Sequence, residues 1–268
     1  MQPSKELSSL GKRPQKQLGQ NFLVDQKVVD DLLEAGNVTR DDVVIEIGPG
    51  LGALTKVLGE RAKKVIAIEA DYELAANLRE QKIKNVSVIA GDALQVDWTI
   101  SIDRDYKVIA NIPYSITSPL LRKAFQLEKK PILLALLIQK EMAERICAAP
   151  GESNRGFLTL LTEANAEAKI IRKVLPGSFY PSPKVDSAII LVTPFKESRQ
   201  EEIFWPAVEA GFRHKRQTLA NSLRNDLSWP KLKVETVLEH LGLTKLARPA
   251  ELSFEQWKEI SHLKEKLS

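Results

Sequence analysis

Three acidic residues and a glycine-rich turn are spaced along the first part of the chain in a pattern that suits a small-ligand pocket. Glu46 opens the run EIGPGLGAL, and Glu69 and Asp92 each follow a short apolar run. The turn contains three glycines, at Gly48, Gly50 and Gly52. Glycine permits a tight turn and lets the backbone come close to a bound molecule. These residues are therefore the first candidates for a binding site.

The spacing of the glycines argues against a dinucleotide phosphate as the ligand. It is G-x-G-x-G, whereas a dinucleotide-binding turn has G-x-G-x-x-G. Pro49 stiffens the turn, and Glu46 would repel a phosphate but attract a cation. A carboxylate at Glu69 can accept hydrogen bonds from both ribose hydroxyls, and one at Asp92 can accept from the exocyclic amine of a purine. The set predicts a pocket for a positively charged nucleoside without phosphates, such as S-adenosylmethionine.

A second candidate site follows another apolar run, where KVIAN leads into Asn111, Ile112, Pro113 and Tyr114. The exocyclic amine of adenine is a poor nucleophile because its lone pair is delocalised into the ring. Two acceptors on its N–H bonds, the Asn111 side-chain oxygen and the Ile112 carbonyl, would favour pyramidal geometry at the nitrogen. Pro113 would orient that carbonyl, and Tyr114 would stack on a splayed-out base. The segment predicts methylation of an adenine amine by positioning, without a strong general base; the alternative is a plain turn after a strand.

A rigid loop further along offers a second aromatic contact. It comprises Ser178-Phe179-Tyr180-Pro181-Ser182-Pro183, in which two prolines stand beside two aromatic side chains. Phe179 could pack on the face of the base opposite Tyr114. The alternative is a proline-rich connection whose aromatic side chains belong to the core.

Strand-like and helix-like runs alternate over residues 43–193, and they must position the candidate residues. The predicted strands are short and apolar at consecutive positions: 43–47, 65–68, 86–90, 107–111, 133–139, 168–174 and 188–193. Such runs are typical of strands buried on both faces of a parallel sheet. Amphipathic segments lie before or between them, at 25–35 with Asp25 as the expected N-cap, at 54–62 and at 72–81. The alternation predicts an α/β fold with a doubly wound sheet, whose edge collects the candidate residues.

Beyond Thr193 the strand-like runs cease, and apolar residues recur at helical spacing to the end of the chain. We expect a linker near 194–200. The predicted organisation is a basic N-terminal tail at 1–20, a catalytic domain at 21–195 and a small all-helical, RNA-contacting C-terminal domain at 196–268.

The composition limits the class of protein. The chain has 268 residues, a formal net charge of +4, one cysteine and three histidines. A lone cysteine excludes an internal disulfide and a cysteine-based metal cluster, and the helix-like surroundings of Cys147 favour packing over nucleophilic chemistry. Residues 1–20 have no apolar run of the kind that a signal peptide needs, and the most apolar stretch, 132–139, is too short for a membrane span. We expect a cytoplasmic protein that binds neither a membrane nor a metal.

Taken together, the motifs resemble those of the bacterial small-subunit ribosomal RNA adenine dimethyltransferase (KsgA) family over nearly the whole chain. The matching segments are QNFL at 20–23, EIGPGLGALT at 46–55, Glu69, GDA at 91–93, NIPYSITSPLL at 111–121, FYPSPKVDSA at 179–188, GFRHKRQTLANSL at 211–223 and RPAELSFEQW at 248–257. Macrolide-resistance methyltransferases of 23S RNA and mitochondrial transcription factor B proteins share the core. The segments at 179–188 and 211–223 match the 16S enzymes better. One departure is Arg155, which stands where an aromatic residue is expected before a glycine, in a substrate-side loop.

The resemblance implies a class I S-adenosylmethionine-dependent methyltransferase, with a Rossmann-like seven-stranded sheet and a helical C-terminal domain. It implies transfer of two methyl groups to N6 of each of two adjacent adenosines in the 3′-terminal hairpin loop of 16S RNA, within the small ribosomal subunit or its precursor, and a role in subunit biogenesis. The expected cofactor contacts are Gln20, Asn21, Leu23, Glu46, Gly48, Gly50, Gly52, Glu69, Asp92, Ala93 and Asn111. The expected contacts with the reacting base are Asn111, Ile112, Pro113, Tyr114 and Phe179. We expect a monomer.

Basic residues gather in the N-terminal tail and in the segment 211–233. Lysine and arginine neutralise phosphates and make affinity for RNA dependent on salt. The expected RNA contacts are Lys12, Arg13, Lys16, Arg213, Lys215, Arg216 and Arg224. The alternative for each is a solvated surface position.

Other functions stay open at this point. A non-catalytic nucleic-acid-binding factor on the same fold would use the basic segments, but the intact NIPY sequence and the acidic pocket residues argue against it. A 23S RNA adenine methyltransferase would share the catalytic core. An NAD-dependent oxidoreductase is disfavoured by the glycine spacing and because all three histidines lie in the helical region, at His214, His240 and His262.

Overall fold

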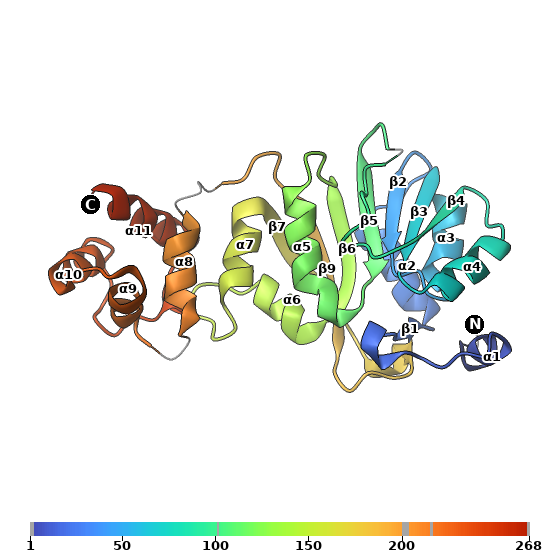
Figure 1. Cartoon of the computed structure of the whole chain (residues 1–268), viewed down its shortest axis with the longest axis horizontal. Coiled ribbons are helices and arrows are strands. Elements are labelled where there is room, and N and C mark those ends of the chain that lie inside the picture. The colour runs from blue at the N-terminus through green and yellow to red at the C-terminus, as the bar shows by residue number, and fades with distance from the viewer. Residues whose placement is uncertain (1–2, 101, 200–203, 215–216, 267–268) are drawn as a thin grey trace. The chain divides into compact units, whose positions relative to one another are not determined.

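The strands predicted from the sequence all form, and together they make one seven-stranded sheet in the computed structural model (Figure 1). The structure describes residues 3–100, 102–199, 204–214 and 217–266. The strands are β1 (Phe22–Leu23), β2 (Val43–Ile47), β3 (Lys64–Glu69), β4 (Val86–Ala90), β5 (Tyr106–Asn111), β6 (Leu133–Gln139), β7 (Ala166–Val174), β8 (Phe179–Tyr180) and β9 (Ser187–Pro194). Each predicted strand begins and ends within two residues of its predicted limits. The short strands β1 and β8, which pair with each other, were not predicted.

Helices connect and cover these strands. They are α1 (Pro3–Ser9), α2 (Gln26–Ala35), α3 (Ala53–Arg61), α4 (Tyr72–Glu80), α5 (Thr117–Gln126), α6 (Lys140–Ile146), α7 (Phe157–Asn165), α8 (Phe204–Arg213), α9 (Leu219–Leu227), α10 (Lys231–His240) and α11 (Phe254–Lys266). Single 3₁₀ turns occur at η1 (Lys16–Leu18), η2 (Tyr114–Ile116), η3 (Pro176–Ser178) and η4 (Pro249–Glu251). Among the described residues, no helix is long and apolar enough to cross a membrane.

The sheet has the order β4-β3-β2-β5-β6-β9-β7. The pairs β4–β3, β3–β2, β2–β5 and β5–β6 are parallel, whereas β9 runs antiparallel to β6. The expectation of a parallel sheet buried on both faces is therefore wrong at this edge. The connection from β7 to β9 holds no helix beyond one 3₁₀ turn, so it cannot make the crossover that a parallel neighbour needs. At the edge strand β7, Ile170 and Ile171 are exposed.

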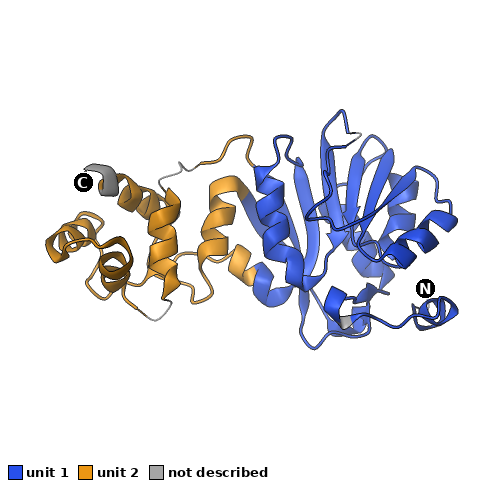
Figure 2. Ribbon diagram, viewed as in Figure 1, with its two compact units in different colours: residues 1–143, 167–194 blue, residues 144–166, 195–268 orange. Residues whose placement is uncertain are grey.

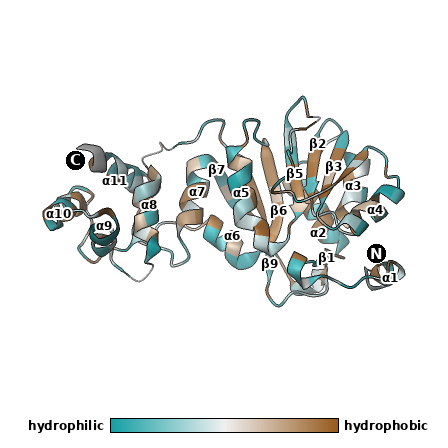
Figure 3. Cartoon of the chain, in the orientation of Figure 1, coloured by the Kyte–Doolittle hydropathy of each residue, from teal (hydrophilic) through white to brown (hydrophobic). Residues whose placement is uncertain are grey.

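The central strands form because their side chains are apolar on both faces. All five residues of β2 are buried, and the strands of the sheet carry the strongest hydrophobic colour in Figure 3. Asp25 caps α2, as predicted, by accepting a hydrogen bond from the Lys27 N–H at 3.0 Å. The apolar face of α2, which includes Val28 and Leu32, packs into the core beside β5, β6 and β9. Burial of this sheet aligns the carboxyl ends of β2, β3, β4 and β5 at one edge.

Figure 2 shows two compact units in the structure. Unit 1 contains the sheet and comprises residues 1–143 and 167–194, and unit 2 comprises residues 144–166 and 195–268. Unit 2 thus takes in α7 as well as the C-terminal helices. The division of the chain into functional domains at 195 and 196 stays a prediction.

Unit 2 has its own apolar core, built from α7 to α11. Its centre is Trp257, which is fully buried, and Gly211 on α8 lies against that indole. A Cβ atom at Gly211 would come within 2.2 Å of the Trp257 ring, so only glycine fits there. Described residues beyond 195 form no strand, which agrees with the predicted all-helical region.

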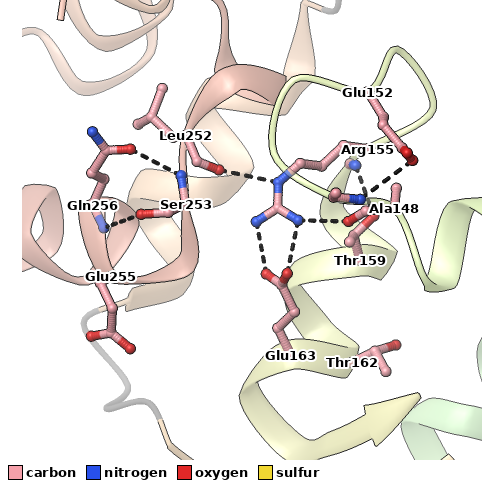
Figure 4. Close-up of polar contacts among 12 residues, drawn as sticks. Ala148, Glu152, Arg155, Thr159, Thr162, Glu163, Leu252, Ser253, Glu255 and Gln256 are labelled. Carbon is pink, nitrogen blue, oxygen red and sulfur yellow. Dashed lines mark hydrogen bonds and ion pairs between the residues drawn. The ribbon is translucent and has the colours of Figure 1, made fainter. Parts of the chain in front are cut away.

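Arg155, the departure noted in the sequence, is a buried arginine at the centre of a polar network in unit 2 (Figure 4). Its guanidinium donates two hydrogen bonds to the Glu163 carboxylate, at 2.8 and 2.7 Å. It also donates to the Leu252 and Ala148 carbonyl oxygens, at 3.1 and 2.9 Å. The side chain of Arg155 is 0% exposed and that of Glu163 is 31% exposed. The network therefore ties the loop before α7 to the segment that precedes α11.

Replacing Arg155 by methionine should lower the free energy of unfolding by about 3 kcal/mol, because a carboxylate and two carbonyl groups lose their buried partner. Denaturation by urea would measure the change. The matched control is Lys245→Met, which breaks a surface ion pair with Glu235. The Lys245 side chain is 76% exposed, so we expect no measurable loss. Similar losses in the two variants would contradict a special role for Arg155.

Candidate active site

The glycine turn after β2 has the backbone that only glycine adopts easily. Gly50 and Gly52 have φ angles of +57° and +84°. A Cβ atom at Gly50 would lie 3.0 Å from the ring of Phe22, and one at Gly52 would lie 2.7 Å from Leu78 Cδ1. Gly52 is the N-cap of α3 and does not line the cavity described below. Its role here is close packing, and cofactor contact by Gly52 stays a prediction.

Glu69 stands at the end of β3 and joins two turns. Its Oε2 accepts a hydrogen bond from the Gly50 N–H at 2.9 Å, and its Oε1 accepts one from the Asp71 N–H at 2.9 Å. The residue is only 6% exposed, and burial raises the pKa of its carboxyl group despite these hydrogen bonds. The carboxylate thus holds the turn after β2 against the turn after β3.

Glu46 is more deeply buried than Glu69. It lies on β2, is 1% exposed, and its Oε2 has no hydrogen-bond partner among the described residues. Burial, with a further contribution from the charge of Glu69, raises the pKa of Glu46 to about 8. The side chain is therefore largely protonated at neutral pH unless a cation approaches it. An orphaned buried carboxyl group beside a cavity is suited to a positively charged ligand.

A cavity of about 380 Å³ lies at this edge of the sheet, within the roughly 300–1,000 Å³ of small-ligand sites. It brings together nearly all of the predicted cofactor and base residues. Those that line it are Gln20, Asn21, Leu23, Glu46, Gly48, Gly50, Glu69, Asp92, Ala93, Asn111, Ile112, Pro113 and Tyr114. The segment 17–19 and the residues Ser115 and Ile116 also line it and were not predicted.

The segment that follows β5 forms one wall of the cavity. The Asn111 side chain donates from Nδ2 to the Asn21 carbonyl oxygen at 3.0 Å, which orients the amide and leaves Oδ1 as an acceptor. Tyr114 lies in η2, and its hydroxyl forms a 2.7 Å hydrogen bond with the Ser187 hydroxyl on β9. Burial raises the pKa of Tyr114, so the phenol stays neutral. Both side chains are therefore held by partners outside their own segment.

The N-terminal segment packs against the rest of unit 1 beside the cavity, which the sequence did not indicate. Leu7 is buried with Phe22, Leu51 and Leu74 in a small apolar cluster. These contacts place the segment 17–23, which lines the cavity, next to the glycine turn. A described segment with a buried leucine is not a solvated tail.

Asp71 is the polar anchor of this segment. It caps α4 by accepting from the Glu73 and Leu74 N–H groups, and its Oδ1 also accepts from Lys12 Nζ at 2.7 Å. Lys12 Nζ contacts Glu73 at 2.5 Å, and its side chain is only 10% exposed. Although burial opposes ionisation, the Lys12 hydrogen bond leaves the pKa of Asp71 below its usual value. The side chains of Gln15 and Gln20 also donate to Asp71, at 3.2 and 3.3 Å.

The remaining predicted residues do not all reach this site. Phe179 is 4% exposed in the hydrophobic core of unit 1, where it pairs with Leu23, and it does not line the cavity. Its stacking on a base stays a prediction. Cys147 is half-buried, and burial raises the pKa of its thiol to about 11, which disfavours a nucleophilic role as expected.

The predicted RNA-contacting residues differ in whether they already form ion pairs. Lys12 pairs with two carboxylates, so an RNA contact would have to break those ion pairs. Arg213, Arg13 and Arg224 are all exposed, and Arg213 pairs with Asp226 at 2.9 Å. The Lys16 side chain, Lys215 and Arg216 lie outside what the structure describes.

Known proteins resemble this chain over most of its length. A family model described as ribosomal RNA adenine dimethylase matches residues 11–266. The chain is 39% identical over 254 residues to the ribosomal RNA small subunit methyltransferase A of Clostridium botulinum (strain Langeland), with 92% of each protein covered. It is 41% identical over 238 residues to the probable ribosomal RNA small subunit methyltransferase A of Pyrococcus abyssi, which covers 88% of this chain and 86% of that protein.

Two solved structures share the fold. A dimethyladenosine transferase from Plasmodium falciparum has a TM-score of 0.78 and 28% sequence identity, covering 91% of this chain and 98% of that one. The 23S rRNA methyltransferase ErmE has a TM-score of 0.71 and 29% identity, covering 91% and 99%. The predicted Rossmann-like α/β fold is confirmed.

The protonation of Glu46 should make stability depend on pH. Between about pH 5 and pH 8 the folded protein keeps a proton on Glu46 that the unfolded chain releases, so unfolding releases a proton and the free energy of unfolding falls as pH rises. This linkage to the protonation of Glu46 should lower the free energy of unfolding by roughly 3 kcal/mol as pH rises across this window. In Glu46→Gln this contribution should vanish, which urea denaturation of both proteins across the window would show. Parallel pH profiles for the two proteins would contradict a protonated Glu46.

Proposed function

We propose a substrate for this chain from one premise: it belongs to the ribosomal RNA adenine dimethylase family. The protein is an S-adenosylmethionine-dependent enzyme that dimethylates adenine in ribosomal RNA. The substrate that we propose is the 3′-terminal hairpin loop of 16S RNA, in which each of two adjacent adenosines receives two methyl groups at N6. The RNA would be read within the small ribosomal subunit or its precursor, so that the reaction takes part in subunit biogenesis.

The observation that carries the proposal is that two kinds of residue line one cavity. Glu46 and Glu69 are acids that suit a cationic nucleoside, and they line the cavity. Asn111 and Tyr114, which suit an adenine, line the same cavity. An RNA adenine methyltransferase needs its cofactor and its target adenine to lie next to each other, so both groups of residues must line one space. The curated relatives named as small-subunit methyltransferases favour 16S over 23S RNA as the substrate.

The cavity fits S-adenosylmethionine by the chemistry of its lining. The orphaned Glu46 carboxyl group would pair with the positive charge of the ligand, and Glu69 would accept from the ribose hydroxyls. Asp92 would accept from the adenine amine, and Gln20, Asn21, Leu23 and Ala93 would close around the ligand. When bound, the cofactor supplies a methyl group on a sulfonium centre.

The residues after β5 would prepare the substrate amine. The Asn111 Oδ1 atom and the Ile112 carbonyl oxygen would accept its two N–H bonds, which favours a pyramidal nitrogen with an accessible lone pair. The hydrogen bond from Asn111 Nδ2 to Asn21 holds the amide in the orientation that this needs. Tyr114 would stack on the flipped base. The methylated nitrogen is acidic enough to give its proton to water, so positioning supplies most of the catalysis.

RNA binding outside the cavity would use exposed basic side chains. We propose Arg13 in unit 1 and Arg224 in unit 2, both exposed, as phosphate contacts, with the remainder of the segment 211–233. Such contacts would make affinity fall as salt rises. The enzyme would act as a monomer.

The decisive experiment uses purified protein, methyl-labelled S-adenosylmethionine and ribosomal subunits that lack the modification. We expect label in N6,N6-dimethyladenosine of 16S RNA from the small subunit, mapped to the two adjacent adenosines, and none in 23S RNA. Label in 23S RNA, or none in dimethyladenosine, would overturn the proposed substrate. The Asn111→Ala variant is the matched control, because it should bind RNA and transfer no methyl group.

Substitutions on the two walls of the cavity should separate cofactor binding from the RNA step. Glu69→Gln should weaken S-adenosylhomocysteine binding by about 10- to 100-fold, since a charged acceptor is lost, while RNA affinity stays unchanged. Calorimetry and filter binding would measure the two affinities. Equal losses of both affinities in a folded variant would show that Glu69 is misassigned.

Tyr114→Ala should show the opposite pattern. Loss of base stacking should lower the methylation rate by about 10- to 100-fold and leave the affinity for S-adenosylhomocysteine within about 3-fold. Tyr114→Phe keeps the ring and loses only the hydrogen bond to Ser187, so it should keep most of the activity. If the phenylalanine variant were as slow as the alanine variant, stacking would not be the role of this residue.

A further inference from the structure

Lys123, on α5, holds the loop that follows β4. Its Nζ atom lies 3.0 Å from the Ala93 carbonyl oxygen, 3.1 Å from that of Leu94 and 2.5 Å from that of Val96. An ammonium group has three N–H donors, and here three carbonyl groups of one loop converge on it. The loop therefore folds around the lysine head group.

Trp98 completes the same arrangement. Its indole is fully buried, and Nε1 donates to the Ala93 carbonyl oxygen at 2.7 Å. Lys123 Nζ lies 5.4 Å from the centroid of that ring, within cation–π range. The Ala93 carbonyl thus accepts from both side chains, so the backbone next to Asp92 is held from two directions.

Asp92 has one carboxylate oxygen that accepts no hydrogen bond within this loop. Its Oδ1 accepts the Leu94 N–H at 2.8 Å, and its main-chain oxygen accepts from the Gln95 and Val96 N–H groups, each at 2.9 Å. Its Oδ2 accepts no hydrogen bond from the described residues, and the residue lines the cavity. Burial lowers the pKa of Lys123, while the negative charges of Asp97 and Asp92 partly oppose this.

We propose that Lys123 is a positioning residue for recognition of the cofactor's adenine: it holds the loop 92–98 so that Asp92 can accept from the exocyclic amine. The inference rests on the proposed function, in which Asp92 contacts that amine. Lys123 itself does not line the cavity, so its effect must pass through the loop.

Because Lys123 lies on α5, its contact with the loop 92–98 also joins that loop to the segment that carries Tyr114. The helix begins at Thr117, directly after the η2 turn that carries Tyr114. Lys123 therefore connects the helix that follows the base segment with the loop that follows β4. A lysine without that role is available for comparison. The Lys129 Nζ atom lies 3.5 Å from the Ile102 carbonyl oxygen, and neither Lys129 nor Ile102 lines the cavity.

The test compares two ligands by calorimetry on the full chain. One is S-adenosylhomocysteine, and the other is its analogue with hydrogen in place of the 6-amino group. Lys123→Met should weaken binding of the first by about 10- to 50-fold and that of the second by less than about 3-fold, because only the first offers an amine to Asp92. The matched control Lys129→Met should leave both affinities within about 2-fold.

A double-mutant cycle with Asp92→Asn identifies the route of the effect. If Lys123 acts through Asp92, the double variant should bind S-adenosylhomocysteine no more weakly than Asp92→Asn alone. Equal weakening of both ligands by Lys123→Met, or additive losses in the double variant, would overturn the proposal. If Asp92→Asn weakens binding and Lys123→Met does not, the positioning role fails and the cofactor site stands. If Asp92→Asn has no effect, the proposed adenine contact fails, and the positioning role with it.

Trp98→Phe provides a second variant should the methionine variant fail to fold. It keeps an aromatic ring in the buried site, removes the donor to the Ala93 carbonyl and fills less of the space that the indole occupied. A smaller loss, again confined to the ligand with an amine, is expected. A loss shared by both ligands would contradict the proposal in this variant as well.

Discussion

One buried carboxylate, Glu69, connects the parts of the molecule on which the cavity depends. Its two oxygens accept from backbone N–H groups on different turns, that of Gly50 after β2 and that of Asp71 after β3. Asp71 in turn caps α4 and anchors the N-terminal segment through Lys12, Gln15 and Gln20. Segments that are far apart in the sequence thus meet around two adjacent acids, Glu69 and Asp71. The parallel order of the strands makes this possible, because it brings their carboxyl ends to one edge.

The formal net charge of +4 conceals two opposite arrangements of charge. Around the cavity, Glu46 is buried with no hydrogen-bond partner for its Oε2, and Glu69 is buried with only backbone hydrogen-bond partners. Elsewhere several basic side chains form ion pairs with acids of the same chain, such as Lys12 with Asp71 and Arg155 with Glu163. The number of basic residues is therefore a poor guide to which of them can reach RNA. The exposed ones, such as Arg224, are the better candidates.

The sheet and most of the cavity could be predicted because both depend on local sequence. Runs of buried Val and Ile define the strands, and the polar residues that follow them mark the ligand edge. The antiparallel β9 could not be predicted, because its direction depends on the β7–β9 connection rather than on its own residues. Gln20, Asn21 and Leu23 were predicted, but the packing of the residues before them, such as Leu7 and Lys12, was missed for a similar reason. Lys12 and Asp71 are 59 residues apart, and Asp71 looks like an ordinary helix cap in the sequence.

The central claim is that separate segments close around one nucleoside cofactor, and hydrogen exchange measured by mass spectrometry tests it most directly. Adding S-adenosylhomocysteine should slow amide exchange in segments 17–23, 46–52, 69–74, 91–94 and 111–116 together, because all of them line the cavity or hold its lining in place. Exchange in α9 and α10 should stay unchanged. Protection that spares both 17–23 and 69–74, or that appears chiefly in unit 2, would contradict the account.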